Sequence, residues 1–154
     1  MWHFFNSILY PDQDPFPLEK TVDCFLSGVH QYGPFFDHVL QYWLESQKNP
    51  RKILFLKYEE LKRDPKGEVK KLAEFLGKPF ASEEEIDKVL SRCSLERLKN
   101  LEVNKSGSIL YNVHNSLYFR KGVVGDWKNY LTPEMEEEID QTSHIKLGEN
   151  GLFF

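Results

Sequence analysis

The chain has 154 residues, of which 40% are hydrophobic and 14% aromatic, and its formal net charge is −4 at pH 7. This length and composition are typical of one folded domain with a substantial hydrophobic core, and they argue against a disordered chain. The net negative charge argues against a nucleic-acid-binding protein, because such proteins need a broad basic face. Any anion site must therefore be local and built from a few donors.

Cysteine usage and the absence of long apolar runs predict a cytoplasmic protein. The two cysteines, Cys24 and Cys93, have no C-x-x-C spacing, so we expect free and mostly buried thiols in a reducing compartment. The first residues show no basic n-region followed by a long apolar segment, so no signal peptide is expected. No apolar run approaches the ~20 residues needed to cross a bilayer. No cluster has the spacing of metal ligands, so we expect no metal.

Helical periodicity dominates the first third of the chain. Apolar residues from Trp2 to Leu9 recur at helical spacing, although no residue suited to capping precedes them. A second helix is predicted over residues 18–30. A third carries an apolar stripe over residues 36–44, ends at Asn49 and Pro50, and is expected to pack against a sheet.

Residues 53–56, Ile-Leu-Phe-Leu, form a short continuous apolar run, which is typical of a strand buried on both faces. Such a strand needs neighbours that satisfy its backbone N–H and C=O groups. No other stretch of the chain has the pattern of such a neighbour. We therefore predict an α/β fold, helix-rich with few parallel strands, in which residues 1–154 form the C-terminal part of a single larger domain.

Capping signals mark the later helices. Asp64 and Pro65 begin a helix that stops near Gly77, and residues 82–85, Ser-Glu-Glu-Glu, form a capping box that opens a helix reaching Cys93. A short helix is predicted around residues 95–101.

The stretch after this short helix is predicted to be irregular. Residues 102–118 have no reliable periodicity and are rich in Asn, Ser and Gly, which favours a long polar loop leading into Arg120. Thr132 and Pro133 then supply a cap and a first-turn proline for a last helix with an acidic first turn.

Residues 120–128, RKGVVGDWK, contain the parts of an anion-binding loop. Arginine presents a planar fork of donors that matches two phosphate oxygens, and Lys121 adds a second positive charge. Gly122 has no side chain, so its backbone N–H can approach an anion closely. Residues 125–127, Gly-Asp-Trp, supply a turn, a capping side chain and an apolar anchor. The alternative is a solvated Arg-Lys pair before a turn, with Trp127 in the core.

The run RKGVVGDWK, followed by NYLT, closely resembles the C-terminal signature of the cytosolic sulfotransferase family, especially its plant flavonol and steroid types. The resemblance implies a P-loop-NTPase-like domain in which Arg120, Lys121 and Gly122 grip the 3′-phosphate of 3′-phosphoadenosine 5′-phosphosulfate (PAPS). It also implies transfer of a sulfuryl group from PAPS to a hydroxyl of a small aromatic or steroid-like acceptor. The resemblance covers essentially the whole chain but begins partway into the family's domain.

Further nucleotide contacts follow from the same resemblance. Tyr58 matches a tyrosine that reaches the adenine, Cys93 and Ser94 match a pair that lines the nucleotide, and Tyr118 and Phe119 flank the phosphate clamp. The structural alternatives are an ordinary tyrosine, a helix end with a small buried thiol, and two core aromatics.

The acceptor side is represented by one residue. Phe4 resembles an aromatic residue of the acceptor pocket. On the nucleotide side, Leu95 stands where many members carry a phenylalanine that stacks on adenine.

The family's Lys-Ser-Gly-Thr-Thr sulfate loop is absent from these residues. None of the histidines matches the catalytic base, so no catalytic residue is assigned; they are His3, His30, His38, His114 and His144. The alternative function is a non-catalytic product that retains part of the nucleotide site or complements a separate N-terminal half.

A possible dimer motif lies after the clamp. Residues 128–137 resemble the family's Lys-x-x-x-Thr-Val-x-x-x-Glu motif, with Pro133 in place of valine. Proline removes a backbone donor and fixes φ, so the motif does not predict the oligomeric state.

Overall fold

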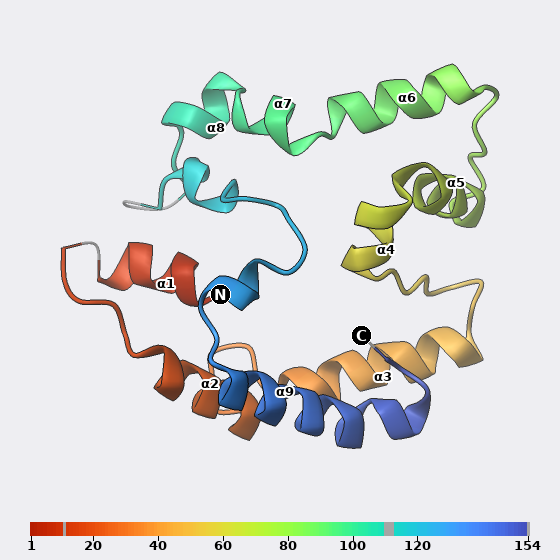
Figure 1. Cartoon of the computed structure of the whole chain (residues 1–154). Helices are drawn as coiled ribbons and strands as arrows, with labels where there is room; N and C mark the ends of the chain where they lie inside the picture. The colour runs from red at the N-terminus through yellow and green to blue at the C-terminus, as the bar shows by residue number, and fades with distance from the viewer. Residues whose placement is uncertain (11, 110–112, 154) are drawn as a thin grey trace. The chain divides into compact units, whose positions relative to one another are not determined.

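The computed structural model describes residues 1–10, 12–109 and 113–153. Helices joined by loops dominate it (Figure 1). The chain divides into two compact units. The first unit comprises Met1, His3–Gln13 and Leu56–Val124, and the second comprises Trp2, Asp14–Phe55 and Gly125–Phe154. No helix among the described residues is long and apolar enough to span a membrane.

The helices of eight residues or more occur close to where the sequence predicts them, whereas the short helix at residues 58–63 has no counterpart in the sequence prediction. Those of the first unit are α1 (Trp2–Leu9, whose first residue is assigned to the second unit), α4 (Tyr58–Arg63), α5 (Pro65–Phe75), α6 (Glu83–Arg92), α7 (Leu95–Lys99), α8 (Glu102–Ser106) and the 3-10 helix η1 (Asn115–Tyr118). Those of the second unit are α2 (Leu18–Ser27), α3 (Phe35–Lys48), α9 (Pro133–Lys146) and the 3-10 helices η2 (Asp126–Asn129) and η3 (Gly148–Asn150). Helix α2 ends earlier than predicted because Gly28 adopts φ of 75°, a left-handed conformation that stops a helix.

The core of the second unit forms where α2 and α3 contact α9. Phe36, Leu147 and Leu152 are buried there. Partly buried apolar side chains surround them: Phe25, Leu26, Val39, Leu40, Trp43 and Phe55. The Trp43 indole N–H also donates to the Asn150 carbonyl at 3.0 Å. The predicted stripe over residues 36–44 is therefore an inward face, but it packs on helix α9 and the C-terminal segment rather than on a sheet.

Local capping explains where α9 begins. The Thr132 hydroxyl accepts a hydrogen bond from the Met135 N–H at 3.3 Å, and Pro133 occupies the first turn, as predicted. A hydrogen bond from its own backbone N–H lowers the pKa of the Glu134 carboxyl, and one from the Thr132 hydroxyl lowers it further. Thr132 and Pro133, which belong to the dimer-like motif, thus form the N-terminal cap and first residue of this helix.

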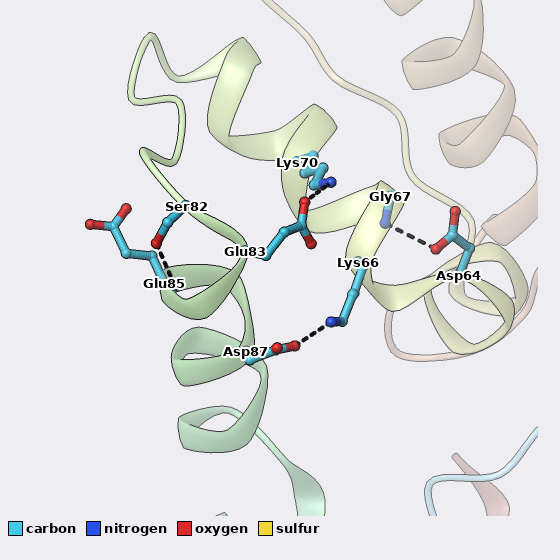
Figure 2. A network of polar contacts seen from close by, with 8 residues as sticks. All are labelled: Asp64, Lys66, Gly67, Lys70, Ser82, Glu83, Glu85 and Asp87. Carbon is cyan, nitrogen blue, oxygen red and sulfur yellow. Dashed lines mark hydrogen bonds and ion pairs between the residues drawn. The ribbon is translucent and has the colours of Figure 1, made fainter.

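Local caps also explain where α5 and α6 begin (Figure 2). The Asp64 carboxylate accepts from the Gly67 N–H at 3.0 Å, and the Ser82 hydroxyl accepts from the Glu85 N–H at 3.4 Å. The Glu85 carboxylate accepts from Ala81 at 2.9 Å, one residue before the Ser82 N–H expected of a strict capping box.

Two ion pairs join α5 to α6. The Lys66–Asp87 and Lys70–Glu83 pairs both measure 2.5 Å (Figure 2). Their members are four residues apart on each helix and run in opposite order along the chain. All four side chains are about half exposed, so the pairs contribute little stability.

The strand predicted at residues 53–56 is not present as a strand. The only β-pairing within the described ranges is an isolated bridge between Ser108 and His114. Residues 53–56 run without helix or strand between α3 and α4 (Figure 1). The reason is that a strand is defined by its partners, and the described residues supply none.

The loop predicted over residues 102–118 is also more ordered than expected. It contains α8 and η1, which contact each other. Residues 110–112 of the predicted loop, including Asn112, lie outside the described residues. The Asn115 side-chain amide donates to the Val103 carbonyl at 2.8 Å, and the Asn115 backbone N–H donates to Gly107 at 2.9 Å. Polar side chains thus hold short helical turns that have no apolar periodicity to reveal them.

Candidate functional site

The segment from Arg120 to Gly122 follows η1 in the first unit. The Arg120 and Lys121 side chains are exposed, and Gly122 has φ of 61°. A Cβ placed on Gly122 would lie 2.6 Å from Cδ2 of Leu95. The left-handed backbone therefore favours glycine at this position, and a Cβ there would displace the end of the Leu95 side chain.

The Leu95 contact brings the α6–α7 junction beside the predicted clamp. Cys93 ends α6, and Ser94 caps α7 by accepting a hydrogen bond from the Arg97 N–H at 3.3 Å. Three of the residues singled out from the sequence, Ser94, Leu95 and Gly122, thus share one region of the first unit. The Cys93 thiol is free, as expected, but it is exposed, so the expectation of a buried thiol is wrong for this residue.

The start of α1 lies near Arg120. Burial lowers the pKa of the Met1 amino group, and the positive charge of Arg120 lowers that pKa further. The Phe4 ring lies 5.0 Å from the Tyr118 ring between centroids, with the planes tilted by 43°. The structure therefore brings the predicted acceptor-pocket aromatic into contact with a residue predicted to flank the clamp.

The remaining aromatic candidates are less clearly placed. Phe119 is half-buried, whereas Tyr118 is 52% exposed, so Tyr118 is not a core aromatic. Tyr58 begins α4 and is 47% exposed. Among the described residues, no hydrogen bond or ring contact joins Tyr58 to the group around Gly122. Its nucleotide contact stays a prediction.

The second part of the RKGVVGDWK motif lies in the second unit. Gly125 has φ of 79° and starts η2, which confirms the predicted turn. Asp126 is buried, and its carboxylate accepts from the Asn129 amide at 3.1 Å. Trp127 is 40% exposed, with the Lys128 ammonium 5.3 Å from its ring centroid. Trp127 is therefore not a core residue, which was the alternative expectation for it.

The residue types of this segment are those of an anion-binding loop. Two neighbouring exposed cations and a glycine with a left-handed backbone provide charge, a bidentate donor and access to backbone N–H groups. Sequence reasoning missed the contact between Leu95 and Gly122, because no local pattern joins residues so far apart in the chain. Within the described ranges, no three His, Cys, Asp or Glu side chains gather to hold a metal ion.

A family model described as a sulfotransferase domain matches residues 1–151. The chain belongs to the sulfotransferase family. Among its relatives, cytosolic sulfotransferase 5 of Arabidopsis thaliana is 47% identical over 99% of this chain and 49% of the relative. Flavonol 4′-sulfotransferase of Flaveria chlorifolia is 48% identical over 98% of this chain and 49% of the relative. The chain thus spans about half the length of these relatives.

Solved sulfotransferase structures have the same fold. Mouse sulfotransferase SULT7A1 complexed with PAP matches with a TM-score of 0.72 and 31% identity, over 94% of this chain and 52% of that chain. Retinol dehydratase in complex with androsterone and inactive cofactor PAP matches with a TM-score of 0.79 and 26% identity, over 98% and 44%. These findings confirm the family and the fold class predicted from the sequence, a helix-rich part of a P-loop-NTPase-like sulfotransferase domain.

Proposed function

We propose that this chain is the nucleotide-binding, C-terminal part of a single sulfotransferase domain that uses PAPS. Arg120 holds the 3′-phosphate through its bidentate fork, Lys121 adds charge, and Gly122 allows the backbone to approach the phosphate. The observation that carries the proposal is the conformation of Gly122, where φ of 61° favours glycine beside two exposed cations and the Leu95 side chain packs closely. The relatives' PAP complexes support the same ligand class.

The neighbouring residues complete the proposed nucleotide site. Cys93 and Ser94 line the nucleotide, since their junction lies beside Gly122 through Leu95. Tyr58 reaches the adenine, and Phe119 flanks the clamp. The bound nucleotide supplies the sulfuryl group, while these residues orient it and balance the charge that develops on the departing phosphate. The proposed reaction needs no metal.

We further propose a small hydroxyl compound, aromatic or steroid-like, as the acceptor. The contact between Phe4 and Tyr118 supplies an aromatic surface next to the clamp region, and flat rings pack well on such a surface. Relatives named flavonol 4′-sulfotransferase and cytosolic sulfotransferase support this acceptor class and a cytoplasmic location.

The nucleotide site is tested by thermal shift with 3′,5′-diphosphoadenosine. At about 100 times its Kd, the ligand should stabilise the chain by roughly 2.7 kcal/mol. Adenosine 5′-monophosphate, which lacks the 3′-phosphate, should give a much smaller shift, and Arg120→Ala should remove the difference between the two ligands. Arg51→Ala is the matched control, because Arg51 is an exposed arginine of the second unit. Equal shifts with both ligands in the unaltered chain would refute the 3′-phosphate clamp.

A second prediction concerns catalysis by these 154 residues alone. We expect no measurable sulfuryl transfer, because no histidine here matches the family base and no Lys-Ser-Gly-Thr-Thr loop is present. A radiolabelled-sulfate assay with the purified chain and a flavonol acceptor measures this directly. Turnover would show that another residue serves as base. Nucleotide binding without turnover is the expected result, and turnover restored by adding a separate N-terminal half would favour the alternative function, a partial site that complements such a half.

A further inference from the structure

One residue of α7 bonds to both sides of the junction between α6 and α7. Helix α6 ends at Arg92, and Ser94 caps the start of α7, so the junction consists of Cys93 and Ser94. The Arg97 backbone N–H donates to the Ser94 hydroxyl at 3.3 Å, and Nη1 of the Arg97 guanidinium donates to the Arg92 carbonyl at 3.3 Å. Arg97 therefore links the residue before the junction to the residue that ends it.

The bond to Arg92 satisfies the end of a helix. The last carbonyls of a helix lack partners within it, and a cation near them also interacts favourably with the helix dipole. The Val89 carbonyl accepts from the Cys93 N–H at 2.9 Å, whereas the Arg92 carbonyl accepts from the Arg97 side chain. The guanidinium thus helps to end α6 at the position where the proposed nucleotide-lining pair begins.

The two arginines at this junction differ in their bonds, although both are exposed. Within the described ranges, no ion pair involves either Arg92 or Arg97. The Arg97 side chain bonds to the backbone, whereas the Arg92 side chain makes no hydrogen bond to another described residue. The two side chains therefore carry the same charge near the same junction, but only that of Arg97 shapes it.

We propose that Arg97 is a positioning residue of the nucleotide site. Its two bonds fix the junction so that Cys93 and Ser94 line the nucleotide and the next residue, Leu95, packs on Gly122. The inference rests on the proposed function and adds to it a residue that does not itself touch the nucleotide. Each bond is long for an N–H···O hydrogen bond, so the effect on affinity is smaller than that of the clamp.

The test compares Arg97→Met with Arg92→Met in the 154-residue chain by isothermal titration with 3′,5′-diphosphoadenosine. Methionine has a helix propensity close to that of arginine but has neither its charge nor its donors. Arg97→Met should weaken binding about tenfold, because it removes a hydrogen bond from a charged donor. Arg92→Met removes the same charge but no side-chain bond, so at about 0.15 M salt the affinity should change by less than about twofold.

A conservative variant separates positioning from general loss of stability. In Arg97→Lys, an ammonium group can still donate to the Arg92 carbonyl, although it lacks the planar fork of arginine. Its affinity should therefore lie between those of the unaltered chain and Arg97→Met. Because the Arg97 side chain is exposed, all the variants should melt within a few degrees of the unaltered chain when no nucleotide is present.

Hydrogen exchange reports the junction without any nucleotide. The Leu98 N–H donates to the Ser94 carbonyl at 2.9 Å in the first turn of α7. If the Arg97 side chain holds this turn, the Leu98 amide should exchange about tenfold faster in Arg97→Met than in Arg92→Met, because local opening becomes easier. This measurement tests the bond to Arg92 even if nucleotide binding fails.

Four results would overturn the inference alone. They are unchanged affinity in Arg97→Met, equal losses of affinity in Arg97→Met and Arg92→Met, no recovery in Arg97→Lys, and equal exchange of the Leu98 amide in both methionine variants. Failure of the unaltered chain to bind the nucleotide would overturn the proposed function and this inference together.

Discussion

Replacing Gly122 with valine is expected to weaken binding of 3′,5′-diphosphoadenosine by at least 100-fold. The left-handed conformation, with φ of 61°, costs a residue with a Cβ about 1–2 kcal/mol, and a β-branched side chain is worse suited still. The new Cβ would also lie 2.6 Å from Cδ2 of Leu95, so either the loop or Leu95 must move. Because Arg120 and Lys121 immediately precede this turn, their donors would lose their orientation. Isothermal titration measures the affinity.

A matched glycine distinguishes loss of the clamp from general strain. Gly77 has φ of 65°, but a Cβ there would meet no atom within 4 Å. Gly77→Val should therefore lower stability through the same backbone strain while leaving nucleotide affinity within about twofold. Unchanged affinity in Gly122→Val would contradict the assignment of the clamp.

The Leu95 contact can be tested separately from the backbone. In Gly122→Ala the steric conflict with Leu95 remains, whereas in the double variant Leu95→Ala, Gly122→Ala the space is open. Affinity should recover in part, because only the backbone strain is left. The double variant binding no better than Gly122→Ala would show that the packing of Leu95 on this glycine has no role.

Leu147→Ala is expected to lower the free energy of unfolding of the second unit by about 2–5 kcal/mol. Leu147 is 1% exposed and packs with Phe36 and Leu152, so truncation leaves a cavity at the centre of this core. Ile145, two residues earlier in the last turn of α9, is 62% exposed, and Ile145→Ala should change stability by only about 0.5 kcal/mol.

Urea unfolding followed by tryptophan fluorescence measures both variants. All three tryptophans, Trp2, Trp43 and Trp127, belong to the second unit, so the signal reports that unit. Equal losses of stability in the two variants would show that the core does not centre on Leu147.

Much of the helical structure could be predicted because its causes lie within a few residues of each other. Asp64, Ser82 and Thr132 each cap a helix by accepting a backbone hydrogen bond from a residue three positions later. The predictions failed where local signals were weak or misleading. A hydrogen bond from the Asn115 side-chain amide to the Val103 carbonyl holds the short helices α8 and η1. Their sequences have no periodic apolar pattern from which they could be predicted.

The amino-acid sequence by itself determined the family, the clamp motif and most helix boundaries, since short-range hydrogen bonds and apolar periodicity are written in neighbouring residues. Only the tertiary structure placed Leu95 against Gly122 and Phe4 against Tyr118, because those contacts join residues far apart in the chain. It also left Trp127 exposed and residues 53–56 without strand partners within the described ranges. Burial and β-pairing depend on what other segments supply, and no local pattern contains that information.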